Sequence, residues 1–453
     1  MSDKSSRREF LDRTGRTVSA VTLGLASSDF LTQRAAWAAH TQAEVKPKTA
    51  GQAPVMALIG CGGMGRGNMN NLIGHGIPFA AVCDVDESHM RAAADEVEKR
   101  QRKRPEMIKD FRKVIERKDI DAVVIATPDH WHALPTIYAA QAGKDMHLEK
   151  PICHNITEGR VMVNAVKRNK NVVQVGTWQR STPEFVDAID YIRKGRLGKV
   201  TVVRAWKTDD FRMGKNATKE PPRELDYDFW IGPAEMVPYT GKNTHFDWRW
   251  YWNYAAGMTG DWGVHMMDIG LLGMSPGTDL VMPTEVSAYG GKLAWPDDDR
   301  TTPDTHVAIM QFPGFVFHWE TGRKPVDGTN SAHNNATQFV AADGSSLTVW
   351  RGGWSVKGPD GKEREKTTDP AFRGKYDHMQ NFLDCIVSRE QPRSHLESMY
   401  QTTTVCHLAN VAYLAGEPVR WSKEKNDIVG KAGKDTLAYQ RKYRKPWSLP
   451  KIG

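Results

Sequence analysis

Three polar residues form a set that could take a proton from a hydroxyl group. Asp261 and His265 are four residues apart, so on one helix they would share a face. A carboxylate beside an imidazole fixes the tautomer of the ring and stabilises its charged form, and such a histidine exchanges a proton near neutral pH. Lys150 follows an apolar run and could hydrogen-bond the same hydroxyl. Together these groups suit alcohol oxidation, in which a hydride passes to a nicotinamide as the proton leaves.

The same residues leave two other interpretations open. Asp261 and His265 could instead be an ion pair on the exposed face of a helix. They could also belong to a metal site together with Asp268, His130 or His132. No spacing among these residues demands a metal, and we therefore predict none.

A glycine-rich turn provides a place for a dinucleotide. The apolar run 55–59 suits a buried parallel strand, and the next six residues, 60–65, fit G-x-G-x-x-G. The first glycine permits the tight turn, the second lets the backbone approach a pyrophosphate, and the third lets the helix pack closely on the strand. The amides that begin this helix would then point at the phosphates. We expect the cofactor to contact Gly60, Gly62, Gly63, Met64 and Gly65.

An acidic residue follows the next apolar run. Residues 79–83 end in Asp84, nineteen residues after Gly65. A carboxylate there can accept hydrogen bonds from both ribose hydroxyls and would repel a 2′-phosphate, so Asp84 favours NAD over NADP. The other interpretation of Asp84 is a turn residue that caps the following helix, for which Ser88 is a second candidate.

More strand and helix units follow, and they predict the α/β class for residues 53–178, with a Rossmann-type, doubly wound parallel sheet. Apolar runs at 122–126 and 145–148 are each followed by polar residues, with a helix expected at 135–142 between them. Ligands bind at the carboxyl ends of strands in such sheets. The further cofactor contacts expected there are Thr127, Pro128, His132, Glu149 and Lys150.

Residues 179–453 predict an α+β domain with a large, mostly antiparallel open sheet. Turn signals separate short runs of strand-forming residues. We expect strands at 199–206, 285–291, 306–312, 315–320, 338–342 and 346–350. The loops at 212–226 and 292–304 show no regular pattern.

At this point the sequence resembles the glucose–fructose oxidoreductase / inositol dehydrogenase family, usually written Gfo/Idh/MocA. The resemblance lies in the glycine loop, the Thr127-Pro128 turn and, above all, Glu149-Lys150-Pro151. It continues through 194–200, 260–268 and 378–384, and so covers nearly everything from residue 53 onward. It implies that Lys150, Asp261 and His265 carry the catalytic roles. It also implies a homo-oligomer formed through the open face of the second sheet.

Aromatic residues gather in the second domain, where a sugar could bind. Six of the fifteen tryptophans lie between Trp206 and Trp262. Sugar rings stack their C–H faces on aromatic rings, while nearby polar groups bind the hydroxyls. The alternative is that these rings pack the interface between the domains. The expected substrate contacts are His132, Arg249, Trp250, Tyr254, Asp261 and His265.

Two functions remain open for this chain. The first is an NAD-dependent oxidoreductase that acts on a hydroxyl of a sugar or cyclitol and holds its cofactor tightly. The second is a glycoside hydrolase, as found among relatives, which uses bound NAD to oxidise, eliminate, hydrate and reduce. The acetylgalactosaminidase-like relatives depart from Glu-Lys-Pro at the lysine, and this chain keeps it, which favours the oxidoreductase.

The N-terminus resembles a twin-arginine (Tat) signal peptide. Ser6-Arg7-Arg8-Glu9-Phe10-Leu11 precedes a weakly apolar stretch and the small-x-small site Ala36-Trp37-Ala38. We expect a signal over 1–38, a polar linker over 39–52, and export to the periplasm by the Tat machinery. The closing residues 443–447 resemble an exported subgroup of the family. Because the Tat route carries folded proteins, the cofactor would be loaded in the cytoplasm.

Composition excludes several other classes. The chain has 453 residues, of which 40% are hydrophobic and 26% are charged, so a soluble globular composition is indicated. No apolar run is long enough for a transmembrane helix. The net charge of +8 is spread along the chain without a basic stripe, so nucleic acid is not an expected partner. Five cysteines without a C-x-x-C pair argue against a disulfide scaffold or a zinc ribbon.

Overall fold

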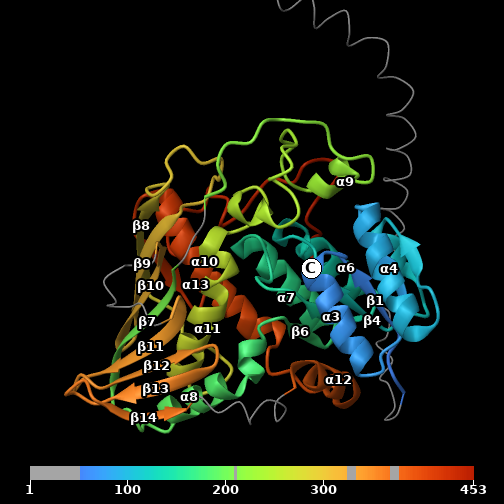
Figure 1. Cartoon of the computed structure of the whole chain (residues 1–453). Helices are drawn as coiled ribbons and strands as arrows, with labels where there is room; N and C mark the ends of the chain where they lie inside the picture. Colours follow the sequence, from blue (N-terminus) through green and yellow to red (C-terminus); the bar gives the residue numbers. More distant parts are fainter. Residues whose placement is uncertain (1–51, 209–211, 324–332, 368–376, 453) are drawn as a thin grey trace, which may run out of the picture.

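The computed structural model describes residues 52–208, 212–323, 333–367 and 377–452 (Figure 1). The expected signal over 1–38, and the expected linker except for its last residue, lie outside these ranges. Two sheets organise the described part of the chain. None of the helices in these ranges combines the length and the apolar character that crossing a membrane would require.

The first sheet has six strands, all parallel, in the order β3-β2-β1-β4-β5-β6. Its strands are β1 (Met56–Ile59), β2 (Phe79–Cys83), β3 (Glu106–Ile108), β4 (Ala122–Ile125), β5 (Asp145–Leu148) and β6 (Val173–Val175). The connecting helices are α3 (Gly63–Gly74), α4 (Glu87–Gln101), α5 (Phe111–Glu116), α6 (Ala133–Gln141) and α7 (Ile156–Asn169). This strand order is that of a Rossmann fold, which confirms the predicted doubly wound sheet.

The strands of this sheet are apolar throughout because both of its faces are covered. Along β1, Ala57 and Ile59 belong to one core cluster, whereas Met56 and Leu58 belong to another. The second cluster is completed by α12 (His378–Ser388), which comes from the far end of the sequence. Burial on both faces explains the continuous apolar runs that predicted parallel strands.

The second sheet has ten strands in the order β14-β13-β12-β11-β7-β10-β9-β8-β15-β16. Neighbouring strands are antiparallel except for β7 and β10, which confirms the predicted, mostly antiparallel sheet. The strands are β7 (Val200–Thr208), β8 (Glu285–Gly291), β9 (Thr305–Phe312), β10 (Phe315–Gly322), β11 (Asn335–Ala341), β12 (Ser346–Trp350), β13 (Gly353–Lys357), β14 (Glu363–Thr367), β15 (Val419–Ser422) and β16 (Asp427–Ile428).

Helices cover one face of the second sheet, as Figure 1 shows for α10, α11 and α13. The helices of this domain are α8 (Pro183–Arg193), α9 (Tyr227–Ile231), α10 (Gly257–Asp261), α11 (Gly263–Met274) and α13 (Leu396–Ala415). Burial alternates along β9, where His306, Ala308, Met310 and Phe312 are buried. The residues between them are more exposed, which is typical of a sheet with one packed and one open face.

Candidate functional site

The glycine turn lies at the carboxyl end of β1 and leads into α3. Gly60 has a φ of 95°, and a Cβ there would lie 2.6 Å from the carbonyl of Ala126. A Cβ on Gly65 would come within van der Waals overlap of the Gly60 carbonyl oxygen. Side chains at these two positions are therefore excluded by the close approach of the turn to β4 and of α3 to β1.

The middle glycines face open space instead. A Cβ on Gly62 or Gly63 would meet nothing within 4 Å, so their backbone is free for a ligand to approach. Gly62 is the N-cap of α3 and provides no side-chain cap, which leaves the first amides of a twelve-residue helix for an anion. These features fit the pyrophosphate of a dinucleotide, and Met64, which is 47% exposed, lies at the edge of the same opening.

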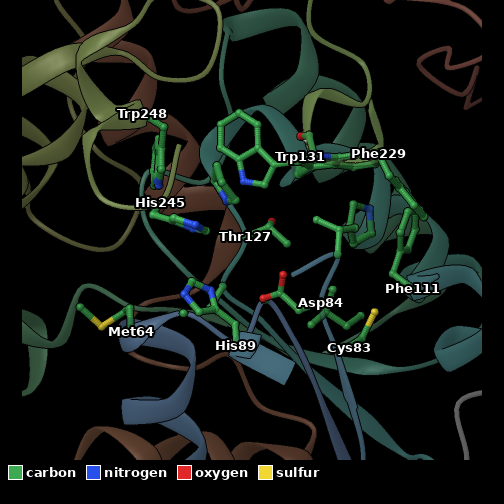
Figure 2. A pocket seen from close by; sticks show the side chains of 18 of the residues that line it. Met64, Cys83, Asp84, His89, Phe111, Thr127, Trp131, Phe229, His245 and Trp248 are labelled. Atoms are coloured by element: carbon green, nitrogen blue, oxygen red, sulfur yellow. Dashed lines mark hydrogen bonds between the residues drawn. The ribbon is translucent and has the colours of Figure 1, made fainter. Parts of the chain in front are cut away.

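Asp84 lies at the end of β2, and its carboxylate points into the pocket beside this turn (Figure 2). It accepts hydrogen bonds from the backbone N–H groups of Cys61 (2.6 Å) and Asp86 (2.9 Å). Burial raises the pKa of Asp84 against the effect of these two bonds. The N-cap of α4 is Asp86, which accepts from the amides of Ser88 and His89. Asp84 is therefore not the cap of α4, and its place fits the expected ribose contact.

The pocket next to the turn has a volume of about 510 Å³. One wall is the Rossmann edge, with Asp84, Thr127 and Pro128 (Figure 2). The buried hydroxyl of Thr127 has no hydrogen-bond partner among the described residues, so a polar group of a ligand could satisfy it. The other walls are largely aromatic and include Phe111, Trp131, Phe229, Trp230 and Trp248. A flat apolar slot beside a ribose-binding carboxylate fits an adenosine.

His132 lies beneath this pocket rather than in its lining. The side chain is buried, with Nδ1 2.7 Å from the carbonyl oxygen of Pro151 and Nε2 2.8 Å from that of Thr127. Burial lowers the pKa of His132 to about 4, despite these two carbonyls. His132 therefore ties together the two turns that follow β4 and β5 and does not present a free ring nitrogen to a substrate.

A charged cluster connects the two domains beside the cofactor cleft. The Nζ of Lys150 donates to Oδ1 of Asp261 at 2.6 Å and to the Asp261 carbonyl at 2.9 Å. The Nε of Arg249 lies 3.2 Å from the same Oδ1. Burial raises the pKa of Asp261, but Lys150 and Arg249 outweigh it and hold that pKa below its usual value. Asp261 is therefore a fixed anion between two cations.

The expected helix that carries Asp261 and His265 is interrupted at Trp262, so that Asp261 ends α10 and His265 lies in the first turn of α11. Trp262 keeps a right-handed helical backbone conformation, and the charge of Asp261 still acts on His265. The carboxylate of Asp261 is taken up by Lys150 and Arg249, and it makes no hydrogen bond to His265. Sequence spacing could not show this, because the cations that capture Asp261 come from other elements.

His265 is buried, and its Nδ1 has no hydrogen-bond partner among the described residues. Burial, together with the charges of Lys150 and Arg351, holds the pKa of His265 well below its usual value. The ring is therefore neutral at neutral pH, not poised near neutrality as expected. A neutral imidazole with an unpaired nitrogen can accept a hydrogen bond or a proton from a ligand.

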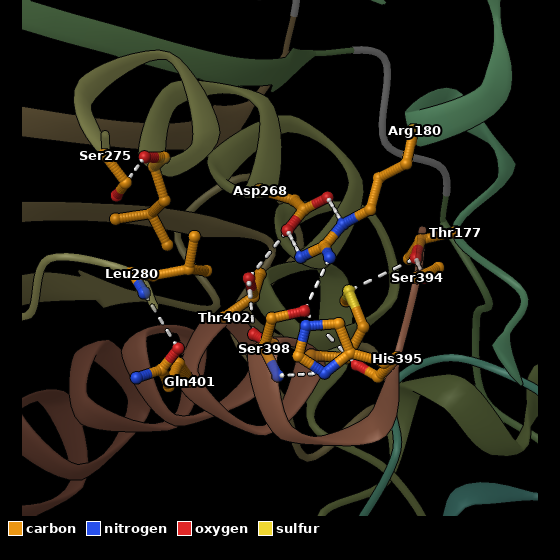
Figure 3. A network of polar contacts seen from close by, with 12 residues as sticks. Thr177, Arg180, Asp268, Ser275, Leu280, Ser394, His395, Ser398, Gln401 and Thr402 are labelled. Atoms are coloured by element: carbon orange, nitrogen blue, oxygen red, sulfur yellow. Dashed lines mark hydrogen bonds and ion pairs between the residues drawn. The ribbon is translucent and has the colours of Figure 1, made fainter. Parts of the chain in front are cut away.

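The helix that carries His265 is held by a buried polar network (Figure 3). Both oxygens of Asp268 on α11 accept from Arg180, at 2.8 and 2.6 Å, and Oδ1 also accepts from the hydroxyl of Thr402 on α13. A further nitrogen of Arg180 donates to Ser398 on α13 at 2.6 Å. Since Arg180 lies just after β6, the network ties α11 and α13 to the segment in which the chain leaves the Rossmann sheet.

Comparison with known proteins identifies both domains. Residues 55–177 match the model of an oxidoreductase family with an NAD-binding Rossmann fold, and residues 194–449 match the model of its C-terminal alpha/beta domain. The chain belongs to the Gfo/Idh/MocA family. The family resemblance seen in the sequence is therefore confirmed for both domains.

Characterised relatives of this family match only part of the chain. It is 38% identical over 109 residues to levoglucosan dehydrogenase of Pseudarthrobacter phenanthrenivorans, covering 24% of this chain and 28% of that protein. It is 28% identical over 199 residues to inositol 2-dehydrogenase 1 of Saccharopolyspora erythraea, covering 42% and 57%. It is 26% identical over 208 residues to alpha-N-acetylgalactosaminidase of Shewanella oneidensis, covering 43% and 44%. The matches thus span between about a quarter and somewhat more than half of these relatives.

A solved family structure shows the same fold. The complex of levoglucosan dehydrogenase with NADH superposes with a TM-score of 0.62 at 18% identity, covering 82% of this chain and 99% of that one. At this identity the likeness concerns the fold. The cofactor assignment rests on the match to the NAD-binding domain and on the glycine turn, Asp84 and Thr127 described above.

Other members of the expected Gfo/Idh/MocA site lie elsewhere. Glu149 is buried and accepts from the side-chain amide of Asn68 at 2.8 Å, so it joins β5 to α3. Trp250 is 2% exposed and Tyr254 is fully buried, and neither lines the pocket. Tyr254 packs edge-on against Trp230, with ring centroids 4.9 Å apart. Of the expected substrate contacts Arg249, Trp250 and Tyr254, Arg249 lines the pocket and also contacts Asp261.

One buried acid of this family member was not a candidate from its sequence. Asp129 follows β4 and is 2% exposed, and its Oδ1 lacks a hydrogen-bond partner among the described residues. Burial raises the pKa of Asp129 well above its usual value, and the charges of Lys150, Asp261 and Arg249 act on it. Asp129 is therefore a further titratable group close to Lys150 and Asp261. The only sequence signal was its place after a buried strand.

Proposed function

We propose that this protein is an NAD-dependent oxidoreductase that acts on a CH–OH group of a sugar or cyclitol. The observation that carries the proposal is the ion pair between Lys150 and Asp261 beside the neutral, unpaired imidazole of His265. These groups lie where the second domain meets the carboxyl ends of the Rossmann strands. Levoglucosan and inositol dehydrogenases among the relatives support this substrate class.

The polar groups divide the work on the reacting hydroxyl. His265, whose ring is neutral, can accept the hydroxyl proton. Lys150 can donate a hydrogen bond to the same oxygen and stabilise its developing negative charge. Asp261 holds the Lys150 ammonium group in place. NAD, when bound, would accept the hydride from the carbon that bears this hydroxyl.

The proposal is tested by offering the protein a panel of free sugars, cyclitols and glycosides. We expect reduction of the bound cofactor, followed by its absorbance, with at least one free sugar or cyclitol. Release of aglycone is measured in the same reactions. If neither the free sugars nor the cyclitols reduce the cofactor while glycosides are cleaved, the oxidoreductase proposal fails.

The second candidate is an NAD-dependent glycoside hydrolase. It is favoured by the match to an alpha-N-acetylgalactosaminidase and by the same Lys150, Asp261 and His265, since elimination also needs a base and an oxidised hydroxyl. Its signature is released aglycone without net change in cofactor absorbance. The oxidoreductase is preferred because this chain keeps Glu149-Lys150-Pro151, whereas the acetylgalactosaminidase-like relatives depart from this sequence at the lysine.

We further propose that the protein is exported in folded form by the Tat machinery to the periplasm, as a member of an exported subgroup. Arg7 and Arg8, with the apolar stretch and small-residue site that follow, support this proposal. Replacement of both arginines by lysine should leave the protein in the cytoplasmic fraction. Unchanged periplasmic recovery of that variant would contradict the proposal.

A further inference from the structure

Two histidines and an aspartate from both domains meet at the edge of the cofactor pocket. Asp86 and His89 begin α4 of the Rossmann domain, and His245 belongs to the second domain. One ligand atom from each of the three lies within 4.8 Å of the others. His89 and His245 both line the pocket (Figure 2), and their ring centroids are 4.6 Å apart.

Backbone contacts fix the place where this cluster forms. Residues of the second domain run alongside the start of α4, where Leu225 pairs with Asp86 in an antiparallel bridge. Glu87 donates its N–H to the carbonyl of Glu224 at 3.0 Å, and Asp226 donates to that of Val85 at 3.0 Å. The three side chains therefore meet at an ordered seam between the domains.

The aspartate has one oxygen to spare for a ligand. Oδ1 of Asp86 accepts from the amides of Ser88 and His89, as a helix cap does. Oδ2 faces the ring of His245, with 3.4 Å between Oδ2 and Nε2.

The two histidine rings lie close together, with their centroids 4.6 Å apart and their planes tilted by 53°. The ring of His89 makes no hydrogen bond to a described residue. An anion is not the natural ligand here, because both Asp84 and Asp86 lie close enough to His245 for their charges to act on it. Two imidazoles and a carboxylate are instead a ligand set typical of a transition metal.

We propose that Asp86, His89 and His245 bind a divalent transition metal, with Zn²⁺ the best match. Zn–N and Zn–O bonds of roughly 2.0–2.2 Å in a tetrahedron place neighbouring ligand atoms about 3.3 Å apart. The 3.4 Å between Asp86 and His245 is close to this length, and His89 offers a ligand atom within 4.8 Å of both. The fourth position faces the pocket and takes water. The prediction of no metal from sequence considered other residues, because these ligands are distant along the chain.

Such an ion would join the two walls of the cofactor pocket. Asp86 and His89 belong to the wall that carries Asp84, and His245 belongs to the segment that covers it. We therefore expect the bound ion to slow the escape of a dinucleotide. The ion site itself does not rest on the proposed catalytic activity, and its test needs no substrate.

The test uses full-length, tag-free protein, with Co²⁺ as a spectroscopic probe and Zn²⁺ in equilibrium dialysis. We expect one ion per chain and visible Co²⁺ absorption that Zn²⁺ displaces. His89→Asn and His245→Asn should each weaken binding more than about 100-fold, the upper end of losses seen for outer-shell partners. His75→Asn is the matched control, because His75 faces the carboxylate of Asp377 at 3.2 Å without a second imidazole.

The outcomes decide the proposal. Thermal unfolding of each metal-free variant beside the wild type verifies that the fold is kept. Binding that is absent from the wild type, or equally strong in His89→Asn and His245→Asn, overturns the ion site. Loss in both variants with retention in His75→Asn supports it. If the ion joins the two walls of the cofactor pocket, Zn²⁺ should lower the dissociation rate of the dinucleotide several-fold. An unchanged rate overturns this role of the ion.

Discussion

At the scale of single residues, the proposed chemistry depends on Lys150 and His265. In the proposed reaction both address the substrate hydroxyl, and neither lies at the glycine turn. Lys150→Met and His265→Ala should therefore keep bound dinucleotide and each slow hydride transfer by about 10²–10⁴-fold, the usual worth of a positioned proton-transfer group. The measurement is single-turnover reduction of the bound cofactor by saturating substrate. A His265→Ala enzyme near the wild-type rate would move the role of base to another group.

The low pKa of His265 has a measurable effect on the pH profile. Burial depresses this pKa, so the ring stays neutral as the pH falls through about 6.5, the usual histidine value. The base is lost only below the depressed pKa. We expect kcat/KM to remain level through that range and to decline at lower pH. An acid limb centred at the usual histidine value would show that His265 is not the titrating base.

Asp84 should set the choice of cofactor. Its carboxylate points into the pocket at the place expected for the ribose, and its charge would repel a 2′-phosphate. Asp84→Ala should lower the ratio of NAD to NADP affinity, measured by titration of the apoprotein with each cofactor. Because the carboxylate also accepts from Cys61 and Asp86, Asp84→Asn serves as the milder companion. An unchanged ratio in both folded variants would assign Asp84 to the turn alone.

At the scale of elements, buried strands were predictable and exposed ones were not. The strands expected at 285–291 and 346–350 match β8 and β12. By contrast, β14 reads Glu-Arg-Glu-Lys-Thr and is mostly exposed at the sheet edge, so it leaves no apolar signal. The contacts of Asp261 with Lys150 and Arg249 were also hidden, because the two cations come from other elements of the chain.

The Arg180–Asp268 network should control how firmly α11 holds His265. Both side chains are at most 2% exposed, so Arg180→Met leaves a buried, unpaired carboxylate and should cost about 3–5 kcal/mol in free energy of unfolding. Turnover should fall as well, since Asp268 is on the helix that carries His265. Chemical denaturation and kcat measure the two effects.

Two companion variants separate burial from charge in that network. Arg180→Met with Asp268→Leu should lose less stability than Arg180→Met alone, because no charge is left unpaired. Lys194→Met breaks the exposed pair with Asp190 and should cost at most about 1 kcal/mol. Equal losses in Arg180→Met and Lys194→Met would contradict the importance given to the buried pair.

At the scale of the whole molecule, sequence revealed the domains but not their contacts. The C-terminal segment returns to the Rossmann domain, where Arg441 and Tyr443 both donate to the buried Glu158. Trp447 then packs against Phe111 and Trp131, which line the cofactor pocket. No periodicity relates residues so distant in sequence. The cluster of Asp86, His89 and His245 was not predicted either, because His245 is distant in sequence from the other two.

The open face of the ten-stranded sheet leads to a prediction about assembly. Tyr289 on β8 is 73% exposed and Ile309 on the neighbouring β9 is 45% exposed, and no described helix packs on that face. Apolar side chains on an uncovered sheet are typical of an interface, so we propose that the chain forms a homo-oligomer there.

Sedimentation should give a multiple of the chain mass. Tyr289→Lys with Ile309→Lys should reduce it to one chain by placing charges in the interface, whereas Leu437→Lys, at an exposed apolar position outside the sheet, should not. A wild-type protein that sediments as one chain, or a double variant that stays assembled, would exclude this face.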